Sequence, residues 1–421
     1  MMTNSTSSSA LSIPNRPIRI FISTGEVSGD LQGSLLITAL HRQAEAMGLQ
    51  LEIVALGGDR MAAAGAHLLG NTSAIGSIGL VESLPFIIPT LLLQRQAKQF
   101  LKQQVPDGVV LIDYMSPNVE FCGYFAKHLP QVPVVYYIAP QEWVWSLSAY
   151  NTKRIVQATR RILAIFPEEA RYFEQKGANV CWVGHPLVDR MQTAPSREQA
   201  RTALGIAPDQ IAIVLMPASR QQEVKYLWPV VAEAARQLQE KLPQVHFWIP
   251  LSLERYRHPI QRSIQTLGLR ATILSNPSQS TLAEVPLSVQ AIAAADLALT
   301  KSGTVNLELA LLNVPQVVLY KVNPVTAWIA SRLLNFSVPY ISPVNLVQMK
   351  PVVREFLQDA ATSENLVQEA LDLLLNPERR QQILADYRTM QQALGAPGVC
   401  DRAAKEILTL LMPTENAVSI T

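Results

Sequence analysis

The chain has 421 residues, a formal net charge of +2 and only 16% charged residues. This length accommodates two domains with sizeable cores, and the scarcity of charge indicates extensive buried or lipid-facing surface. No dense run of lysine and arginine is present in the sequence, which argues against a nucleic-acid partner. The three cysteines are far apart and show no C-x-x-C spacing, so we expect a reducing compartment and neither a metal site nor a cofactor.

The amino-terminal residues 1–17 lack the basic and apolar regions of a secretory signal, so we expect them to form a disordered tail. The longest apolar runs are interrupted by prolines and polar residues, and no transmembrane helix is expected. If lipid is a partner, the protein reaches it from the surface of the membrane.

The first predicted strand, Ile18 to Ser23, runs into a loop with two glycines and then into a helical pattern. Glycines between a strand and a helix indicate a backbone that closely approaches another group. The spacing is not G-x-G-x-x-G, so a dinucleotide cofactor is not expected. A second strand, Leu51 to Leu56, ends at the turn Gly57-Gly58.

A helix ending near Lys102 is predicted after the proline-punctuated segment from Pro85 to Leu93. One face of this helix carries the apolar residues Leu93, Ala97, Phe100 and Leu101, and another carries Arg95, Lys98 and Lys102. The pattern fits a helix that lies on an anionic membrane surface, and it also fits a core-facing helix with a solvated basic side. The apolar run Phe86 to Ile88 favours lipid contact.

The strand Val109 to Ile112 delivers Asp113 to its carboxyl end. Ligands of open α/β sheets bind beyond the carboxyl ends of the strands, so Asp113 is placed where a general base could take a proton from a hydroxyl. The alternative is that Asp113 only caps the helix that follows.

The strand Val134 to Ile138 leads to Trp143 and Trp145, a pair that more often packs than binds. Two further strands, Ile162 to Phe166 and Val180 to Val183, lead to His185. We expect His185 to be a residue of the cleft floor or hinge, and residues 187–207 to link two domains.

The second half begins with the strand Ile211 to Met216, followed by Ser219 and Arg220. A guanidinium after such a strand can form forked hydrogen bonds with a diphosphate. Further strands are predicted at Val245 to Pro250 and at Ala271 to Leu274.

A strand from Leu297 to Leu299, a glycine turn at residues 302–304, a helix and the strand Gln316 to Tyr320 come next. Ser302 or Thr304 can cap this helix. The turn is expected to offer free backbone N–H groups to a phosphate, and Glu308 could accept hydrogen bonds from a ribose. An ordinary βαβ unit with a solvated Glu308 is the alternative. Three helices are predicted from Ser363 to Met412.

Several stretches resemble, in the same order, motifs of the lipid-A-disaccharide synthases, the GT-B glycosyltransferases that join two acylated glucosamines. The matching stretches are G-E-V-S-G-D at 25–30, G-G-D-R-M at 57–61, I-D at 112–113, G-H-P at 184–186, S-R at 219–220, S-G-T at 302–304 with Glu308, and E-F-L-Q at 355–358. The chain departs from the family pattern at Ser116, Ser146, Ala218 and Lys301.

The resemblance implies an α/β fold of GT-B type, with two doubly wound Rossmann-like domains facing a cleft. Residues 18–190 would form the acceptor- and lipid-binding domain and residues 201–360 the UDP-sugar domain. Residues 361–421 would be helices that pack back on the first domain or are exchanged in a homodimer.

The resemblance also implies roles for single residues. Asp113 would be the catalytic base. Nucleotide-sugar binding would involve Ser219, Arg220, Ser302, Gly303, Thr304, Glu308 and Asn345. Acceptor binding would involve Glu26, Ser28, Gly29, Asp30, Asn118 and Trp143.

The implied reaction is an inverting, metal-independent transfer from UDP-2,3-diacylglucosamine to 2,3-diacylglucosamine 1-phosphate, on the cytoplasmic face of the inner membrane. Two alternatives stay open. One is a divergent relative that uses another UDP-amino sugar and lipid acceptor, and the other is a non-catalytic protein that binds nucleotide or lipid.

Overall fold

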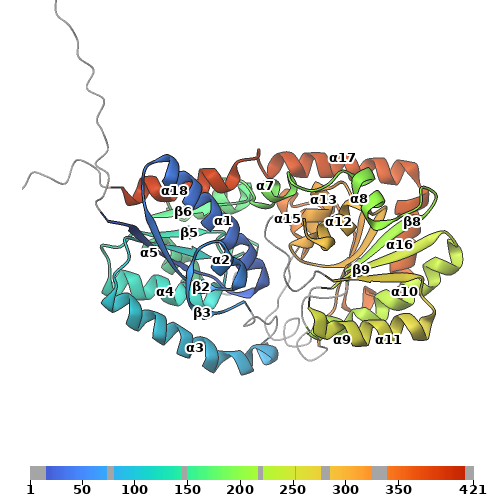
Figure 1. Cartoon of the computed structure of the whole chain (residues 1–421), viewed down its shortest axis with the longest axis horizontal. Helices are drawn as coiled ribbons and strands as arrows, with labels where there is room; N and C mark the ends of the chain where they lie inside the picture. The colour runs from blue at the N-terminus through green and yellow to red at the C-terminus, as the bar shows by residue number, and fades with distance from the viewer. Residues whose placement is uncertain are drawn as a thin grey trace, which may run out of the picture.

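The computed structural model describes residues 16–73, 80–144, 149–216, 221–251, 253–275, 285–323 and 339–412. In this part of the chain two lobes lie side by side, each built around one parallel sheet (Figure 1). The predicted fold class is confirmed, since two doubly wound α/β sheets facing each other are the GT-B arrangement.

The sheet of the first lobe has seven strands in the order β3-β2-β1-β4-β5-β6-β7, and all neighbours are parallel. The strands are β1 Ile18–Ser23, β2 Leu51–Gly57, β3 His67–Asn71, β4 Gly108–Ile112, β5 Val134–Tyr137, β6 Arg161–Ala164 and β7 Val180–Trp182. The chain winds outward from β1 in one direction and from β4 in the other, so the order reverses between these two strands.

The sheet of the second lobe has six strands in the order β10-β9-β8-β11-β12-β13, again all parallel. The strands are β8 Ile211–Met216, β9 Val245–Pro250, β10 Ala271–Leu274, β11 Leu297–Lys301, β12 Gln316–Tyr320 and β13 Glu355–Leu357. Its order reverses between β8 and β11. Strands β1, β8, β9, β10 and β12 have the predicted bounds, whereas β3 and β13 were not predicted as strands.

Helices cover both faces of each sheet. In the first lobe they are α1 Glu26–Ala46, α2 Asp59–Ala63, α3 Leu80–Gln103, α4 Met115–His128, α5 Ala149–Ala158 and α6 Pro167–Gln175. The connection to the second lobe contains α7 Leu187–Met191 and α8 Arg197–Leu204. The second lobe has α9 Gln221–Tyr226, α10 Trp228–Lys241, α11 Arg257–Leu267, α12 Leu287–Ala294, α13 Val305–Leu311 and α15 Pro343–Gln348, with 3-10 turns η1 Glu254–Tyr256 and η3 Gln358–Ala360.

The side chains of the central strands alternate between two cores. In β1, Ile20 and Ile22 join the cluster that contains α1, while Phe21 packs on the other face with Phe121 and Phe125 of α4. Strands buried on both faces need apolar residues at every position, which explains why the sequence predicted them as continuous apolar runs.

The last three helices, α16 Ser363–Leu375, α17 Pro377–Ala393 and α18 Val399–Leu411, confirm the three-helix prediction for this part of the sequence. Helix α17 lies over the second lobe, and α18 lies beside α1 of the first lobe (Figure 1). Asp189 of α7 fixes the start of α18, because its carboxylate accepts hydrogen bonds from the backbone N–H groups of Gly398, Val399 and Cys400.

Helix α3 differs from the prediction because its single run includes Pro85 and Pro89. The apolar face predicted for lipid contact is turned inward, since Ala97 and Leu101 are buried against the sheet. The exposed apolar side chains belong to the preceding turns: Ile87, Ile88, Leu91 and Leu92. Among the described helices, none is long and apolar enough to cross a membrane.

Candidate active site

Both order reversals point toward the space between the lobes. The carboxyl ends of β1 and β4 carry the loop from Thr24 and the turn at Asp113, and the carboxyl end of β11 carries the turn at Ser302. Such reversals open a crevice in which ligands of doubly wound sheets bind. The turn after β8, with Ser219 and Arg220, lies outside the described residues.

The turn after β4 holds Asp113 in an unusual conformation. Asp113 and Tyr114 both have positive φ angles, 45° and 52°, where a residue with a Cβ atom costs about 1–2 kcal/mol. The carbonyl of Asp113 accepts hydrogen bonds from Asn118 Nδ2 and from the Tyr136 hydroxyl, each at 2.8 Å. The Asp113 side chain is exposed, so this framework turns a carboxylate out of the sheet and into the cleft.

Asn118 lies beneath this turn and bonds it to the neighbouring strand ends. It is fully buried, its Nδ2 also bonds the carbonyls of Ser23 and Ile112, and its Oδ1 accepts from the Ser23 hydroxyl at 2.8 Å. Asn118 therefore ties the ends of β1 and β4 together. The described geometry gives it a positioning role rather than a direct contact with an acceptor.

The glycine loop after β1 lies beside the same turn. A Cβ atom on Gly25 would meet the ring of Tyr114 at 2.4 Å, so only glycine fits there. Glu26 follows with a φ of 63° and is half-buried. Asp30 is buried and accepts from the N–H groups of Arg60 and Met61 at the start of α2, so its carboxylate holds a neighbouring helix.

A cavity of about 300 Å³ connects these elements with the second lobe. The residues Ser28, Gly29, Asp113 and Trp143, all predicted for the acceptor side or as base, line it together with the predicted donor residue Thr304. The other lining residues are Gln32, Ile112, Met115, Ile138, Ala139, Pro140, Gln141, Ile165, Phe166, Glu169, His185, Leu307 and Pro343. The structure thus brings Asp113 and the Ser302 turn to one cavity.

Two further titratable groups line this cavity. Glu169 accepts hydrogen bonds from the backbone N–H groups of Ala139, Ile165 and Phe166, at 2.8, 2.9 and 3.3 Å. Burial raises the pKa of Glu169 to about 7, although these three N–H groups lower it. His185 is a cavity-lining residue, as predicted, and burial lowers its pKa to about 3, so it is a neutral ring at physiological pH.

Trp143 lines the cavity and packs on Phe166, with ring centroids 5.7 Å apart. The tryptophan thus both packs and forms a wall of the site. Trp145 and Ser146 lie outside the described residues.

The turn after β11 corrects one expectation. The N–H of Gly303 is not free, because it donates to Asn306 Oδ1 at 2.8 Å. The hydroxyl of Ser302 likewise donates to the carbonyl of Ile341 at 2.7 Å. Thr304 is the N-cap residue of α13 but makes no side-chain capping bond. The turn is therefore held by Asn306. The sequence had instead predicted free N–H groups and a cap from Ser302 or Thr304.

Glu308 is not solvated. It is buried, and its carboxylate forms an ion pair with Arg190 of α7. Burial raises the pKa of Glu308, and the charges of Arg190 and Arg60 partly offset this by lowering it. Arg60 belongs to α2 of the first lobe, so charges from both lobes and their connection meet at Glu308.

Asn345 and Lys301 have partners within the second lobe. Asn345 is buried and donates to the carbonyl of Val353 and to Glu355, which places it behind the site rather than at its surface. Lys301 pairs with Glu223 at 3.0 Å, and both side chains are largely buried. Lys301 is one of the departures from the family pattern, and this pair shows that the lysine is turned inward rather than to solvent.

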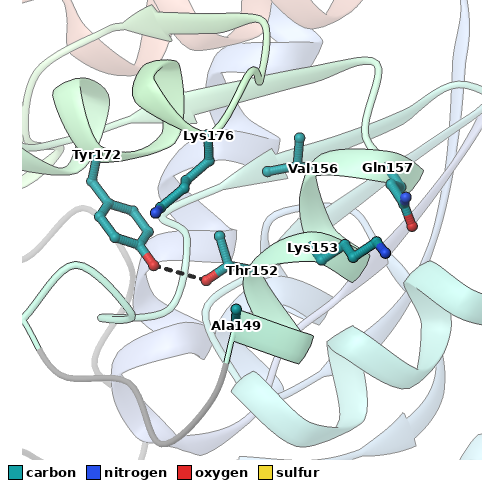
Figure 2. A pocket seen from close by; sticks show the side chains of 7 residues that line it. All are labelled: Ala149, Thr152, Lys153, Val156, Gln157, Tyr172 and Lys176. Carbon is teal, nitrogen blue, oxygen red and sulfur yellow. Dashed lines mark hydrogen bonds between the residues drawn. The ribbon is translucent and has the colours of Figure 1, made fainter.

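A second cavity, of about 410 Å³, lies between α5 and α6 (Figure 2). In Figure 2 the Tyr172 hydroxyl points at Thr152, 2.9 Å away. Its described lining includes Lys153 and Lys176 but neither a carboxylate nor a histidine, and it shares no lining residue with the cavity at Asp113. We therefore assign the chemistry to the smaller cavity, where acid–base groups and both lobes meet.

Sequence reasoning did not single out Gln32, Glu169 or Arg190. For Glu169 a signal existed, because it stands three residues after the end of an apolar strand, at the position of a helix-capping carboxylate. Arg190 and Glu308 are 118 residues apart in sequence, so no local pattern reveals their pairing.

Comparisons with known proteins agree with this geometry. The family described as lipid-A-disaccharide synthetase matches residues 20–408. A lipid-A-disaccharide synthase of Gloeothece citriformis is 60% identical over 391 residues, which are 93% of this chain and 99% of the relative. The corresponding protein of a Synechocystis strain is 52% identical over 93% of this chain and 97% of its own length.

A solved structure, the S. aureus MnaA–UDP co-structure, superposes with a TM-score of 0.62 and covers 96% of this chain and 100% of that one. At 14% identity this likeness concerns the fold alone. The family match and the two relatives extend over nearly all of the sequence, from the first strand to the last helix. The chain therefore belongs to the lipid-A-disaccharide synthetase family.

Proposed function

We propose that this protein joins UDP-2,3-diacylglucosamine to 2,3-diacylglucosamine 1-phosphate, forming lipid A disaccharide 1-phosphate and UDP. Membership of the family supports the activity, and the cavity supports the substrates. Its walls are mostly apolar and span both lobes, as an acylated sugar between donor and acceptor sites requires. The single observation that carries the proposal is that Asp113 and Thr304, from opposite lobes, line one cavity.

In the proposed reaction Asp113 takes the proton of the acceptor's 6-hydroxyl while that oxygen attacks the anomeric carbon of the donor. The new C–O bond forms as the bond from the anomeric carbon to the diphosphate oxygen breaks, and UDP leaves with the bonding electrons. Attack from the side opposite the leaving group inverts the anomeric centre. Asp113 is exposed after the carboxyl end of β4 and lines the cavity, which supports its proposed role in this proton transfer.

The second lobe would hold the nucleotide. Glu308 uses Oε1 for Arg190, and a carboxylate has further lone pairs that a ribose hydroxyl can use. Ser302, Gly303 and Thr304 would lie along the diphosphate, with Ser219 and Arg220 supplied by the turn after β8. Asn345 would act indirectly, through Glu355 and the segment at Ile341 that receives the Ser302 hydroxyl.

The direct test is a product assay with purified protein, both acylated substrates and no added metal, read by mass. Disaccharide phosphate together with UDP is the expected result. A folded protein that binds UDP but forms no disaccharide would contradict the proposal, and acceptors of other structure would then identify a divergent relative. Conversion of the donor without acceptor would instead indicate an epimerase.

We also propose that α3 places the protein on the cytoplasmic face of the inner membrane. Ile88 is 69% exposed, and Leu91 and Leu92 are each 57% exposed, so three large apolar side chains face solvent on adjacent turns. Arg95 and Lys102 follow on the same helix and are exposed, which suits anionic headgroups. Flotation with anionic vesicles should carry the protein upward, and Ile88→Ser with Leu91→Ser should abolish this. Equal flotation of the variant would reject α3 as the contact.

A further inference from the structure

One buried side-chain oxygen at the active-site cavity has no hydrogen-bond partner among the described residues. Gln32, on the second turn of α1, is only 6% exposed and lines the cavity. Its Oε1 is buried and accepts no hydrogen bond from any described residue. A buried amide oxygen without a partner is costly and uncommon in folded proteins.

The other buried polar residues that line this cavity have partners. Glu169 receives three backbone N–H groups, and His185 Nδ1 accepts from the N–H of Leu187 at 3.2 Å. The side chains of Glu169 and His185 therefore already form hydrogen bonds within the protein. Gln32 differs from them, because no described residue donates a hydrogen bond to its Oε1.

The residues that line the cavity with Gln32 indicate which chemical groups a ligand needs in order to pair with this amide. The first-lobe walls of the cavity include the apolar residues Ile112, Ile138, Ile165 and Phe166, together with polar side chains such as Ser28 and Gln141. A buried amide in such a largely apolar wall favours a ligand with a matching polar group, because a ligand without that group leaves the amide desolvated and unpaired. The amide oxygen needs an N–H or O–H donor, and the adjoining NH2 can donate to a carbonyl.

We infer that Gln32 is a specificity-determining residue that receives a hydrogen bond from the acylated acceptor sugar. The inference rests on the proposed function. A diacylglucosamine phosphate carries two kinds of neutral donor besides its reacting hydroxyl, the N–H of the acylamido group and the 4-hydroxyl. Both fit the chemistry of the Gln32 carbonyl, and only the acylamido group also offers a carbonyl to the NH2.

The experiment compares three acceptors on four proteins. The acceptors are the natural one, an analogue with an ester in place of the amide, and a 4-deoxy analogue. The proteins are the wild type, Gln32→Leu, Gln32→Glu and Gln43→Leu as a control. Gln43 lies on the same helix, but its amide bonds Asp401 of α18, so its loss perturbs α1 without touching the cavity.

For wild type and Gln43→Leu, we expect kcat/KM to fall roughly ten-fold with the analogue that lacks the recognised donor, which corresponds to one neutral hydrogen bond. For Gln32→Leu, the natural acceptor should lose the same factor and that analogue should lose nothing further. Sensitivity to the ester identifies the acylamido N–H, and sensitivity to the deoxy compound identifies the hydroxyl. Gln32→Glu keeps an acceptor oxygen and should retain part of the discrimination.

The inference is overturned if Gln32→Leu discriminates among the three acceptors as the wild type does, whatever its overall rate. A purely structural role predicts a lower Tm for Gln32→Leu, whereas removal of an unpaired amide predicts a Tm that is unchanged or higher. Acceptor affinity, followed through the fluorescence of Trp143 at the cavity wall, repeats the comparison without turnover. Absence of disaccharide from the wild type would instead reject the proposed function, while the affinities still decide the role of Gln32.

Discussion

The turn at Asp113 and the turn at Ser302 occupy equivalent places, each after a central parallel strand, yet they are built differently. The first places two residues in succession at positive φ and keeps its carboxylate exposed. The second has a relaxed backbone at Thr304, and the carboxylate of its helix is buried in an ion pair. Each turn is held by an asparagine of its own, Asn118 in the first lobe and Asn306 in the second.

Under the proposed function, this difference separates two uses of a carboxylate. A group that exchanges a proton must reach substrate and water, and the strained turn provides that exposure. A group that only holds a hydroxyl gains from burial and a fixed direction, which Arg190 supplies to Glu308. The following predictions test whether the turn at Asp113 serves proton transfer and the turn at Ser302 serves nucleotide binding.

The largest expected effect is on turnover in the first region. Asp113→Asn keeps the size of the side chain but cannot take a proton, so kcat should fall between about a hundred- and ten-thousand-fold. UDP affinity, measured by calorimetry, should stay within about two-fold, because the proposed nucleotide site is in the other lobe. A rate close to that of the wild type would remove Asp113 from the role of base.

In the second region the largest effect should be on stability and nucleotide affinity. Arg190→Met leaves Glu308 buried without its principal cation, which should cost about 3 kcal/mol in the free energy of unfolding. The double variant Arg190→Met/Glu308→Leu should recover much of that stability and still bind UDP poorly. Urea unfolding and UDP titration of the three proteins measure both effects, and equal UDP affinity in all of them would show that this pair is structural only.

The dependence of stability on pH should report on Glu169, the buried carboxyl group that lines the cavity in the first lobe. The pKa of Glu169 is raised from 4.5 to about 7 in the folded protein, so the folded state favours the protonated carboxyl. Its stabilising contribution is therefore complete below about pH 4.5 and is lost as the pH rises through 7. The loss is at most about 3 kcal/mol.

Glu169→Gln should remove this loss between pH 5 and 8, as measured by urea unfolding at each pH. Asp113→Asn should reduce it slightly, because the charge of Asp113 contributes to the raised pKa. A pH profile of Glu169→Gln parallel to that of the wild type would show that three N–H donors keep this carboxylate charged.

The smallest effects concern the two asparagines. Asn118→Ala and Asn306→Ala each remove buried hydrogen bonds and should destabilise the protein by about 2 kcal/mol. Their functional effects should differ, since Asn118→Ala should lower kcat and Asn306→Ala should weaken UDP binding. If both variants changed the same kinetic parameter, the division between the two regions would be wrong.

Much of the scaffold could be predicted from sequence because its strands are buried on both faces. Five strands were predicted with their observed bounds, since short apolar runs of this length, bounded by polar, proline or glycine residues, are typical of buried strands. The strand β3 was missed because only two of its five residues, Leu68 and Leu69, are large and apolar, as His67–Asn71 reads H-L-L-G-N. Helix α3 was predicted to begin only after the segment from Pro85 to Leu93, because an internal proline usually ends a helix.

The candidate site was predicted in part. The places of Asp113 and Glu308 follow from strand ends and helix starts, which are local features of the sequence. The hydrogen bond of Gly303 to Asn306, the inward turn of Lys301 and the unpaired amide of Gln32 depend on packing. Lys301 and Glu223 are 78 residues apart, so no short pattern records their pairing. Asn306 is only three residues after Gly303, but its sequence position alone does not show which backbone group its side chain binds.

The position of α18 has a consequence for how the protein is made. Helix α1 leaves the ribosome long before α18, although the two helices pack together and share one core cluster. At ordinary rates of synthesis the first lobe waits on the order of tens of seconds with part of its core uncovered. During this interval the apolar side of α1 is exposed and available to chaperones, and a chain that stops before α18 lacks the helix that covers this side of the amino-terminal lobe.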